Sequence, residues 1–455
     1  MISFQNIKNI IVNRIFNIKL LLTLLAVTLC FSANLMSADY ETFELKNGLK
    51  VHMLKTNSPI VTHAVVYNVG SRQETSGKEG VAHYLEHVMF LGTNKYSKKD
   101  FSTMVKETGA YYNAFTSYDL TFYYLNLPSR HLKKAIQIEA DRMKWLLFDD
   151  KLVENEKQVI NQENKMYKNN VYSVFYDSLR SYIFPTTNYG RTIIGWEDEF
   201  NKLTKKDLQD FYNTWYAPNN AQVFIIGDID FIEVKKLAIR YYGRLSPSRK
   251  INYKTKLIEE PYNSSVRVNF KDERIKQDII VKSFLVPSLS SDASVDKKEA
   301  YSLIMLENLL SSSFGKVYKY LVLDKKVLLD FSVNYGVDQQ GSTTFSFTLL
   351  PASGISYEEA ESEFNFILNK TLDAGFSPLE LRENRRLIKD RLELLREDDM
   401  EYLFMVARYM NSGLSYQEIQ KLVNNVSIVK TVDVKNVYNK YIKDSYSVVG
   451  ISQRK

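Results

Sequence analysis

The chain is almost free of cysteine. Cys30 is the single cysteine among 455 residues, and it lies inside an uncharged apolar run from Leu20 to Ala38. If that run is removed from the mature protein, no cysteine remains, which excludes both disulfide bonds and thiol catalysis. A lipoprotein signal is not indicated either, because the residue before Cys30 is not small.

An excess of charge of one sign is also missing. The formal net charge is +7, but Lys8, Arg14 and Lys19 fall in the first 38 residues, which contain no acid, and leave 57 basic against 53 acidic residues. Nucleic-acid-binding proteins present a clustered basic face, so we expect no nucleic-acid partner. With 45% hydrophobic and 25% charged residues, the composition excludes a disordered or collagen-like chain and predicts two or three globular domains.

Only the N-terminal segment is long and apolar enough to cross a bilayer. A basic stretch, the run Leu20–Ala38 and small residues at its end are the parts of a secretory signal. We predict that residues 1–38 are a signal peptide, cut after Ala38 or after Ala33, and that the protein is exported, to the periplasm or the medium of a bacterium. The alternatives are an uncleaved anchor, since about 18 apolar residues can span a bilayer, and a mitochondrial presequence. Membrane contact is expected only if the segment is retained.

Two segments of similar size follow, residues 39–247 and 262–455, joined by a polar, proline-containing linker at 248–261. Each segment begins with strand-like runs and continues with amphipathic helices. In the first, Asn47-Gly48 is typical of a hairpin turn. The predicted fold class is therefore α+β, with two related domains, each an antiparallel sheet covered by helices. The longer helices are expected at Gly80–Phe90, His131–Leu147, Leu152–Tyr176, Lys297–Leu310, Tyr357–Ala374 and Pro378–Arg396.

Histidine is scarce too, with five in the chain, yet two of them form the sequence His83-Tyr-Leu-Glu86-His87. On a helix, residues i and i+4 share a face, so both imidazoles can reach one metal ion. Glu86 lies near that face and can accept a proton from a water on the metal. The pattern is the H-x-x-E-H form of a zinc-protease motif.

A catalytic zinc needs a third protein ligand and an open position. Glu156 and Glu163 stand seven residues apart in a predicted helix, hence two turns apart on one face. One of the two can bind the metal while the other orients a histidine.

With these motifs the chain resembles the pitrilysin/insulysin family of zinc metallopeptidases, in the branch of mitochondrial processing peptidase and its bacterial relatives. The matching motifs run in order through the first half of the chain. They are Gly70–Glu74, Gly80–Thr93, Gly109–Ser117, Glu156–Glu163, Tyr189–Gly190, Ile194–Gly195, Tyr216–Asn220 and Gly227–Asp228.

The resemblance implies His83, His87 and Glu163 as ligands of one Zn²⁺ per chain, Glu86 as general base, and Glu156 as the acid that supports the site. It further implies that Asn113 and Ala114 lie on an edge strand that binds extended substrate through backbone hydrogen bonds. On this basis residues 39–247 form the zinc-binding catalytic domain and residues 262–455 a related domain without metal.

The resemblance also implies two halves that close like a clam around a chamber. Such a chamber admits unfolded or extended peptides and excludes folded proteins. The predicted function is therefore an exported zinc endopeptidase that hydrolyses peptides with a water activated by zinc and Glu86.

The second half departs from the family pattern. Relatives carry an arginine and, seven residues later, a tyrosine that bind substrate and stabilise the oxyanion, but Val322 and Leu329 stand at the aligned positions. Loss of an oxyanion donor typically lowers the rate about 10²–10³-fold. Three explanations are open: another residue replaces the pair, a separate partner chain supplies it, or the activity is weak. The candidate assembly is a homo- or heterodimer with a related chain. The competing interpretations are a non-catalytic subunit and a zinc-binding protein without hydrolysis.

Overall fold

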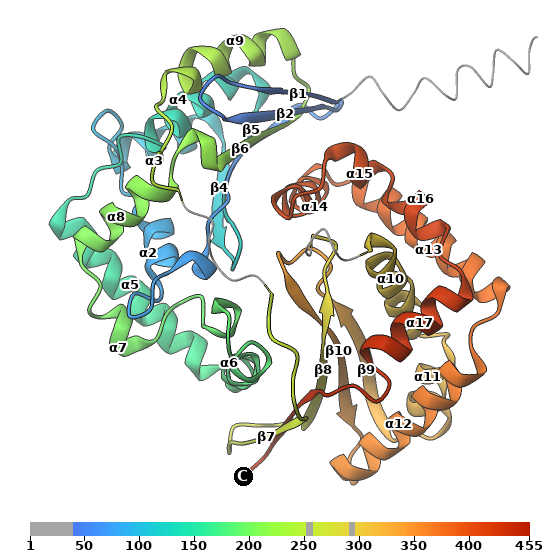
Figure 1. Cartoon of the computed structure of the whole chain (residues 1–455). Coiled ribbons are helices and arrows are strands. Elements are labelled where there is room, and N and C mark those ends of the chain that lie inside the picture. The colour runs from blue at the N-terminus through green and yellow to red at the C-terminus, as the bar shows by residue number, and fades with distance from the viewer. Residues whose placement is uncertain (1–39, 252–257, 291–295) are drawn as a thin grey trace, which may run out of the picture.

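The computed structural model describes residues 40–251, 258–290 and 296–455 (Figure 1). The predicted signal peptide, residues 1–38, lies outside the described residues, and so does the middle of the predicted linker. Within the described part of the chain, no helix has the length and apolar character that a membrane span requires.

The first domain contains a six-stranded sheet with the order β1-β2-β6-β3-β5-β4. Its strands are β1 (Tyr40–Glu44), β2 (Lys50–Lys55), β3 (Ile60–Tyr67), β4 (Tyr111–Thr116), β5 (Thr121–Pro128) and β6 (Ala221–Gly227). β1 and β2 form the hairpin predicted from Asn47-Gly48. β4 lies at one edge of the sheet, which leaves one side of its backbone unpaired within the sheet.

The second domain repeats this topology with five strands in the order β7-β11-β8-β10-β9. They are β7 (Val266–Lys271), β8 (Ile279–Pro287), β9 (Leu328–Tyr335), β10 (Ser342–Pro351) and β11 (Val448–Gln453). Strand for strand, β7 to β11 pair with one another as β2 to β6 do. The prediction of an α+β fold with two related domains is confirmed.

Each sheet is mixed rather than purely antiparallel, which corrects one part of that prediction. β6 runs parallel to β2, and β11 runs parallel to β7. In both domains the last strand returns after a long helical connection and inserts between the first two strands of the repeat. A long crossover permits a parallel pair that a tight hairpin cannot make.

Helices cover the sheets (Figure 1). Those of the first domain are α2 (Val81–Val88), α3 (Lys98–Thr108), α4 (Leu132–Arg142), α5 (Asp150–Asn169), α6 (Val171–Ile183), α7 (Glu197–Phe200), α8 (Lys205–Trp215) and α9 (Phe231–Tyr241). Those of the second are α10 (Lys297–Ser311), α11 (Lys316–Tyr318), α12 (Tyr357–Ala374), α13 (Pro378–Arg396), α14 (Asp399–Asn411), α15 (Tyr416–Gln420), α16 (Leu422–Ser427) and α17 (Thr431–Tyr441).

The single helix predicted for Leu152–Tyr176 is in fact two helices, α5 and α6. The chain leaves the helical conformation at Asn170, whose side chain accepts a hydrogen bond from the backbone N–H of Tyr172 and so caps α6. Asparagine favours such a cap over a helix interior because its side chain competes for backbone hydrogen bonds.

A helix of each domain packs against the sheet of the other domain. Along β3, Val61 and Val65 pack against the helices of their own domain, whereas Ala64 and Val66 join the core of the second domain, where α14 lies against β3. Conversely, α6 of the first domain packs on β7 and β11 of the second sheet. As a result, the side chains on both faces of β3 are buried from Val61 to Tyr67. Closure of the two halves around a chamber stays a prediction.

Candidate metal centre

Helix α2 carries the two histidines, and its first turn is fixed by Glu74. The carboxylate of Glu74 accepts hydrogen bonds from the backbone N–H groups of Gly80, at 3.0 Å, and Ala82, at 2.9 Å. Gly80 has φ of 90°, and a Cβ there would lie 2.6 Å from the carbonyl oxygen of Ile194. A residue with a side chain is therefore not accommodated at the start of this helix.

Three side chains converge beside α2. The Nε2 atom of His87 lies 3.3 Å from Oε2 of Glu163, and Nε2 of His83 lies 3.7 Å from the same oxygen. One ligand atom from each residue lies within 4.8 Å of the other two, a group that could hold a metal ion. Glu163 comes from α5, so the arrangement depends on how α2 and α5 pack.

Glu156, two turns before Glu163 on α5, contacts the far side of one imidazole. Its Oε1 atom lies 3.0 Å from Nδ1 of His87. A carboxylate on Nδ1 fixes the ring orientation and leaves Nε2 free to bind a metal.

The charges around this group favour a cation. Burial lowers the pKa of His83 to about 4. Burial also opposes a charge on His87, but the hydrogen bonds to Glu156 and Glu163 outweigh it and raise the pKa of His87 to about 9. A proton is thus held where two carboxylates meet. Two imidazole nitrogens and one carboxylate oxygen, with one side open, are the donor set of a catalytic zinc, so the residues fit this metal.

Glu86 lies on the same helix between the histidines and is buried. The hydroxyl of Thr116 donates a hydrogen bond of 2.6 Å to its Oε2 atom. Burial raises the pKa of Glu86, and the bond from Thr116 offsets part of that effect. Its carboxyl group is therefore held in one orientation and binds a proton more readily than an exposed glutamate.

A cavity of about 660 Å³ opens beside these residues. All seven site residues predicted from the sequence line it: His83, Glu86, His87, Asn113, Ala114, Glu156 and Glu163. Asn113 and Ala114 lie on the edge strand β4, where Oδ1 of Asn113 accepts a hydrogen bond from the N–H of Ala114. The rings of Phe90 and Tyr112, 5.2 Å apart, form an aromatic part of the wall.

The sequence did not lead us to two residues that contribute to the site, Thr116 and Glu74. Thr116 lies two residues after Ala114, on the same face of β4, and this alternation could have indicated it. Glu74 acts through the N-terminus of α2, which no local pattern in the sequence reveals. Both belong to motifs that carried the family resemblance.

The positions aligned with the family's arginine and tyrosine do not line this cavity, whose described wall comes from the first domain. Val322 lies in a π-helical turn, η6 (Lys319–Asp324), and packs against the core of the second domain. Leu329 lies on β9 and is 56% exposed.

Comparison with family models gives two adjacent matches. Residues 50–197 match the model of "Insulinase (Peptidase family M16)", and residues 202–388 match that of the "Peptidase M16 inactive domain". The first match contains the predicted metal-binding residues, and most of the second lies in the second domain.

Two known proteins with similar sequences are named as proteases. The chain is 27% identical to the zinc protease PqqE of Helicobacter pylori, over 95% of this chain and 98% of that protein. It is 32% identical to the beta subunit of the mitochondrial-processing peptidase of Mus musculus, over 44% of this chain and 41% of that subunit.

Solved structures share the fold. A protease from Helicobacter pylori superposes with a TM-score of 0.83 at 24% identity, covering 91% of this chain and 99% of that one. The first half of the periplasmic protease PqqL from Escherichia coli gives a TM-score of 0.76 at 20% identity, covering 91% and 92%. The resemblance found in the sequence is confirmed, and the chain belongs to peptidase family M16.

Proposed function

We propose that this protein is an exported zinc-dependent endopeptidase that hydrolyses unfolded or extended peptides. The observation that supports it best is the convergence of His83, His87 and Glu163 on one point, with the buried carboxyl group of Glu86 beside them. A metal site with an adjacent proton acceptor is the minimum that metal-assisted peptide hydrolysis requires.

Each side chain has a distinct role in the proposed reaction. His83, His87 and Glu163 would hold a zinc ion, which when bound polarises a carbonyl and lowers the pKa of a water to about 7. Glu86 accepts the proton of the attacking water and delivers it to the leaving amine. Thr116 holds the carboxyl group of Glu86 in place, and Glu156 holds the ring of His87.

The edge strand β4 supports the choice of an extended peptide as substrate. A peptide that pairs with β4 at Asn113 and Ala114 becomes an additional strand of the sheet and passes along the cavity wall. Backbone hydrogen bonds of this kind tolerate many side chains. The N–H of Ala114, which donates to Oδ1 of Asn113 in the structure, would then donate to the bound peptide instead.

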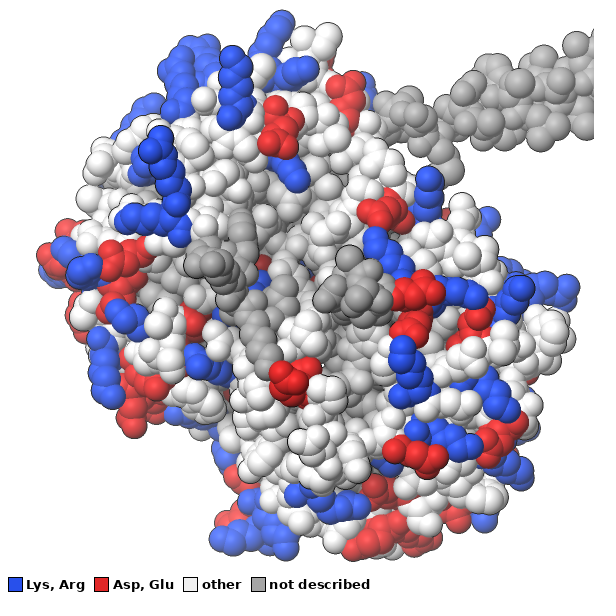
Figure 2. Space-filling model, in the orientation of Figure 1, with Lys and Arg blue, Asp and Glu red and all other residues white. Residues whose placement is uncertain are grey.

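A partner chain is part of the proposal. Because Val322 and Leu329 cannot donate hydrogen bonds and do not line the cavity, a related chain that carries the arginine and the tyrosine would supply the oxyanion donors. Export follows from the predicted signal peptide, and the name of the PqqL neighbour, a periplasmic protease, agrees with it. The face drawn in Figure 2 carries both acidic and basic side chains among many uncharged ones.

The test is a purified chain of residues 39–455, assayed for zinc and for cleavage of quenched peptides with and without chelator. We expect one zinc per chain and activity that chelator abolishes. Glu86→Gln should keep the metal and lose cleavage, because only the proton acceptor is removed. The second candidate function is a non-catalytic subunit, and the missing arginine and tyrosine favour it. Zinc binding without cleavage at any protein concentration would support this candidate.

A further inference from the structure

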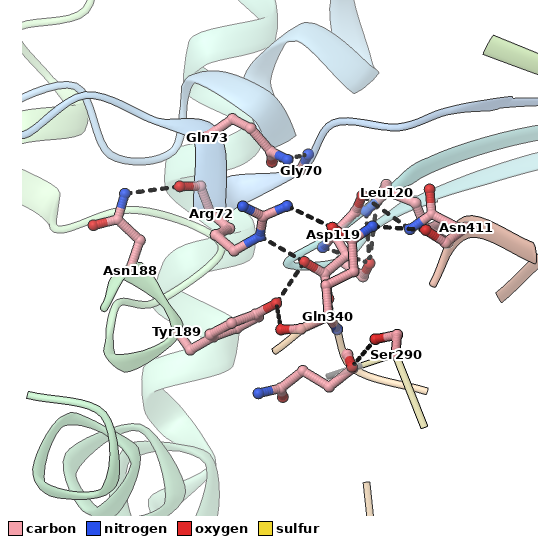
Figure 3. A network of polar contacts seen from close by, with 12 residues as sticks. Gly70, Arg72, Gln73, Asp119, Leu120, Asn188, Tyr189, Ser290, Gln340 and Asn411 are labelled. Atoms are coloured by element: carbon pink, nitrogen blue, oxygen red, sulfur yellow. Dashed lines mark hydrogen bonds and ion pairs between the residues drawn. The ribbon is translucent and has the colours of Figure 1, made fainter. Parts of the chain in front are cut away.

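A buried polar cluster joins the two domains (Figure 3). It consists of Arg72, Asp119 and Tyr189 from the first domain and Gln340 and Asn411 from the second, and we call it the Asp119 cluster. Asp119 lies in the tight turn between β4 and β5. The side chains of Arg72 and Asp119 are only 4% and 11% exposed.

Each of the three oxygen atoms of Asp119 accepts at least one hydrogen bond. Its Oδ1 atom accepts hydrogen bonds from Nε of Arg72 and from the hydroxyl of Tyr189, each 2.7 Å long. Its Oδ2 atom accepts from the backbone N–H of Gln340 at 3.1 Å, and its backbone carbonyl accepts from Nδ2 of Asn411 at 3.2 Å. The first two bonds lie within the first domain, and the last two cross to the second.

Gln340 closes the cluster from the side of the second domain. Its side-chain oxygen accepts a hydrogen bond of 2.9 Å from Nη2 of Arg72, and its Nε2 atom donates one of 2.7 Å to the carbonyl of Asn411. The hydroxyl of Tyr189 also contacts the backbone carbonyl of Gln340, so its single hydrogen is shared between that oxygen and Oδ1 of Asp119. One side chain of the metal-free domain therefore contacts the arginine that pairs with Asp119.

The cluster is continuous with the contacts that hold Glu86. Asp119 follows Thr116 by three residues, and Thr116 donates to Glu86. The turn between them is bound to the segment before α2, because the N–H groups of Ser71 and Arg72 donate to the carbonyls of Ser117 and Tyr118, both at 3.0 Å.

Glycine is required at position 70 for this approach, since a Cβ there would lie 2.2 Å from the carbonyl oxygen of Ser117. Two residues after Arg72, Glu74 caps the N-terminus of α2. The cluster thus reaches the metal-binding helix by one route and the strand that carries Thr116 by another.

Stability alone gives little reason for this arrangement. A buried ion pair adds little net stability over an apolar pair of similar volume, because desolvation of both charges offsets their attraction. What the pair does supply is a fixed relative placement of the groups that it joins.

We propose that Asp119 and Gln340 are positioning residues, through which the metal-free domain holds Thr116 and thereby the carboxyl group of Glu86. This inference rests on the proposed peptidase function only where it is tested by enzyme kinetics. It gives the second domain a part in the reaction although the domain carries no metal ligand.

A double-mutant cycle tests the proposal in the full mature chain. Gln340→Met keeps the side-chain length and removes both side-chain hydrogen bonds, while Thr116→Val removes the hydroxyl that holds Glu86. We expect Gln340→Met to lower kcat about 10-fold, within the range found when catalytic groups are displaced by about 1 Å, and to leave zinc content and KM within about two-fold. The double variant should be no slower than Thr116→Val alone, because both changes release the same carboxyl group.

Asp338→Asn serves as the matched control. Asp338 lies in the same loop as Gln340, but its carboxylate pairs with Arg408, inside the second domain. This variant should keep the wild-type kcat. The proposal would be overturned if the losses of kcat in the two single variants multiplied in the double variant. It would also be overturned if Asp338→Asn lowered kcat as much as Gln340→Met does.

Hydrogen exchange separates this proposal from the proposed function. Gln340→Met should raise the exchange rate of amides in residues 113–120 relative to wild type and to Asp338→Asn, whether or not the protein cleaves peptides. If the wild type has no peptidase activity but the exchange changes as expected, the function fails and the linkage stands. Unchanged exchange in residues 113–120 would overturn the linkage itself.

Discussion

Glu86 and Glu307 make corresponding contacts in the two domains. Glu86 on α2 accepts a hydrogen bond from Thr116 of the edge strand β4, and Glu307 on α10 accepts one of 2.9 Å from the N–H of Tyr335 on the edge strand β9. Both helices connect the second and third strands of the repeated five-strand topology. The duplicated fold has thus kept a partly or fully buried glutamate facing the edge strand, with histidines beside it only in the first domain.

The burial of Glu307 predicts that the free energy of unfolding depends on pH. Burial raises the pKa of Glu307 to about 7, from 4.5 as the ordinary value. Between pH 4.5 and 7 the folded chain then binds more protons at this group than the unfolded chain, so ionisation destabilises the fold increasingly as the pH rises. Glu307→Gln should therefore raise the free energy of unfolding at pH 8 by about 1–3 kcal/mol, and by little at pH 4.5.

Denaturant unfolding at several pH values measures the effect. Glutamine can still accept the bond from Tyr335, so packing is preserved. A gain that is the same at all pH values would show that the charge of Glu307 is not its cause.

The two carboxylates of α5 should differ in their effect on metal binding. Glu163→Gln removes one of the three converging ligands, so we expect metal to be lost or bound far more weakly. Glu156→Gln leaves all three and should weaken binding by about 10–100-fold, as expected for a group that orients a ligand. Zinc titration with a competing chelator measures both constants, and a reversed order would exchange the two roles.

Metal binding should release a proton. With its pKa near 9, His87 carries a proton at pH 7, while His83, with a pKa of about 4, does not. A metal on Nε2 displaces that proton, so zinc binding at pH 7 should release about one proton, and fewer above pH 9. Calorimetry in buffers of different ionisation enthalpy counts the protons released.

Glu156→Gln is the control for this count. Removing that carboxylate removes the largest interaction that raises the pKa of His87, so the variant should release a smaller fraction of a proton at pH 7. An equal release from both proteins would mean that His87 is not the group that loses the proton.

The replaced arginine and tyrosine allow a fourth prediction. Because positions 322 and 329 do not line the cavity of their own chain, the double change Val322→Arg and Leu329→Tyr should raise the turnover rate only where a second chain is bound. We expect an increase of up to about 10²-fold that grows with protein concentration as dimers form. Sedimentation and activity measured over the same concentrations test this, and a rate increase in the isolated monomer would contradict it.

The amino-acid sequence by itself determined the metal-binding pattern of this protein. His83, Glu86 and His87 share one helix, and Glu156 and Glu163 share another, so the regular geometry of a helix places the members of each set relative to one another. The order of strands and helices likewise predicted two related α+β domains. The sequence alone could not reveal that β6 and β11 run parallel to a neighbour, because the alternation of a strand carries no information about its partner's direction.

Tertiary structure decided everything that joins those local sets. The distance from His87 to Glu156, the bond from Thr116 to Glu86 and the contacts of Asp119 with Gln340 link residues 69, 30 and 221 positions apart. Contacts between residues so far apart depend on how whole helices and sheets pack, and no local pattern records that packing. For the same reason the distance between Val322 and the metal residues followed only from the folded chain: a π-helical turn packed on the second domain's core keeps that position away from the cavity.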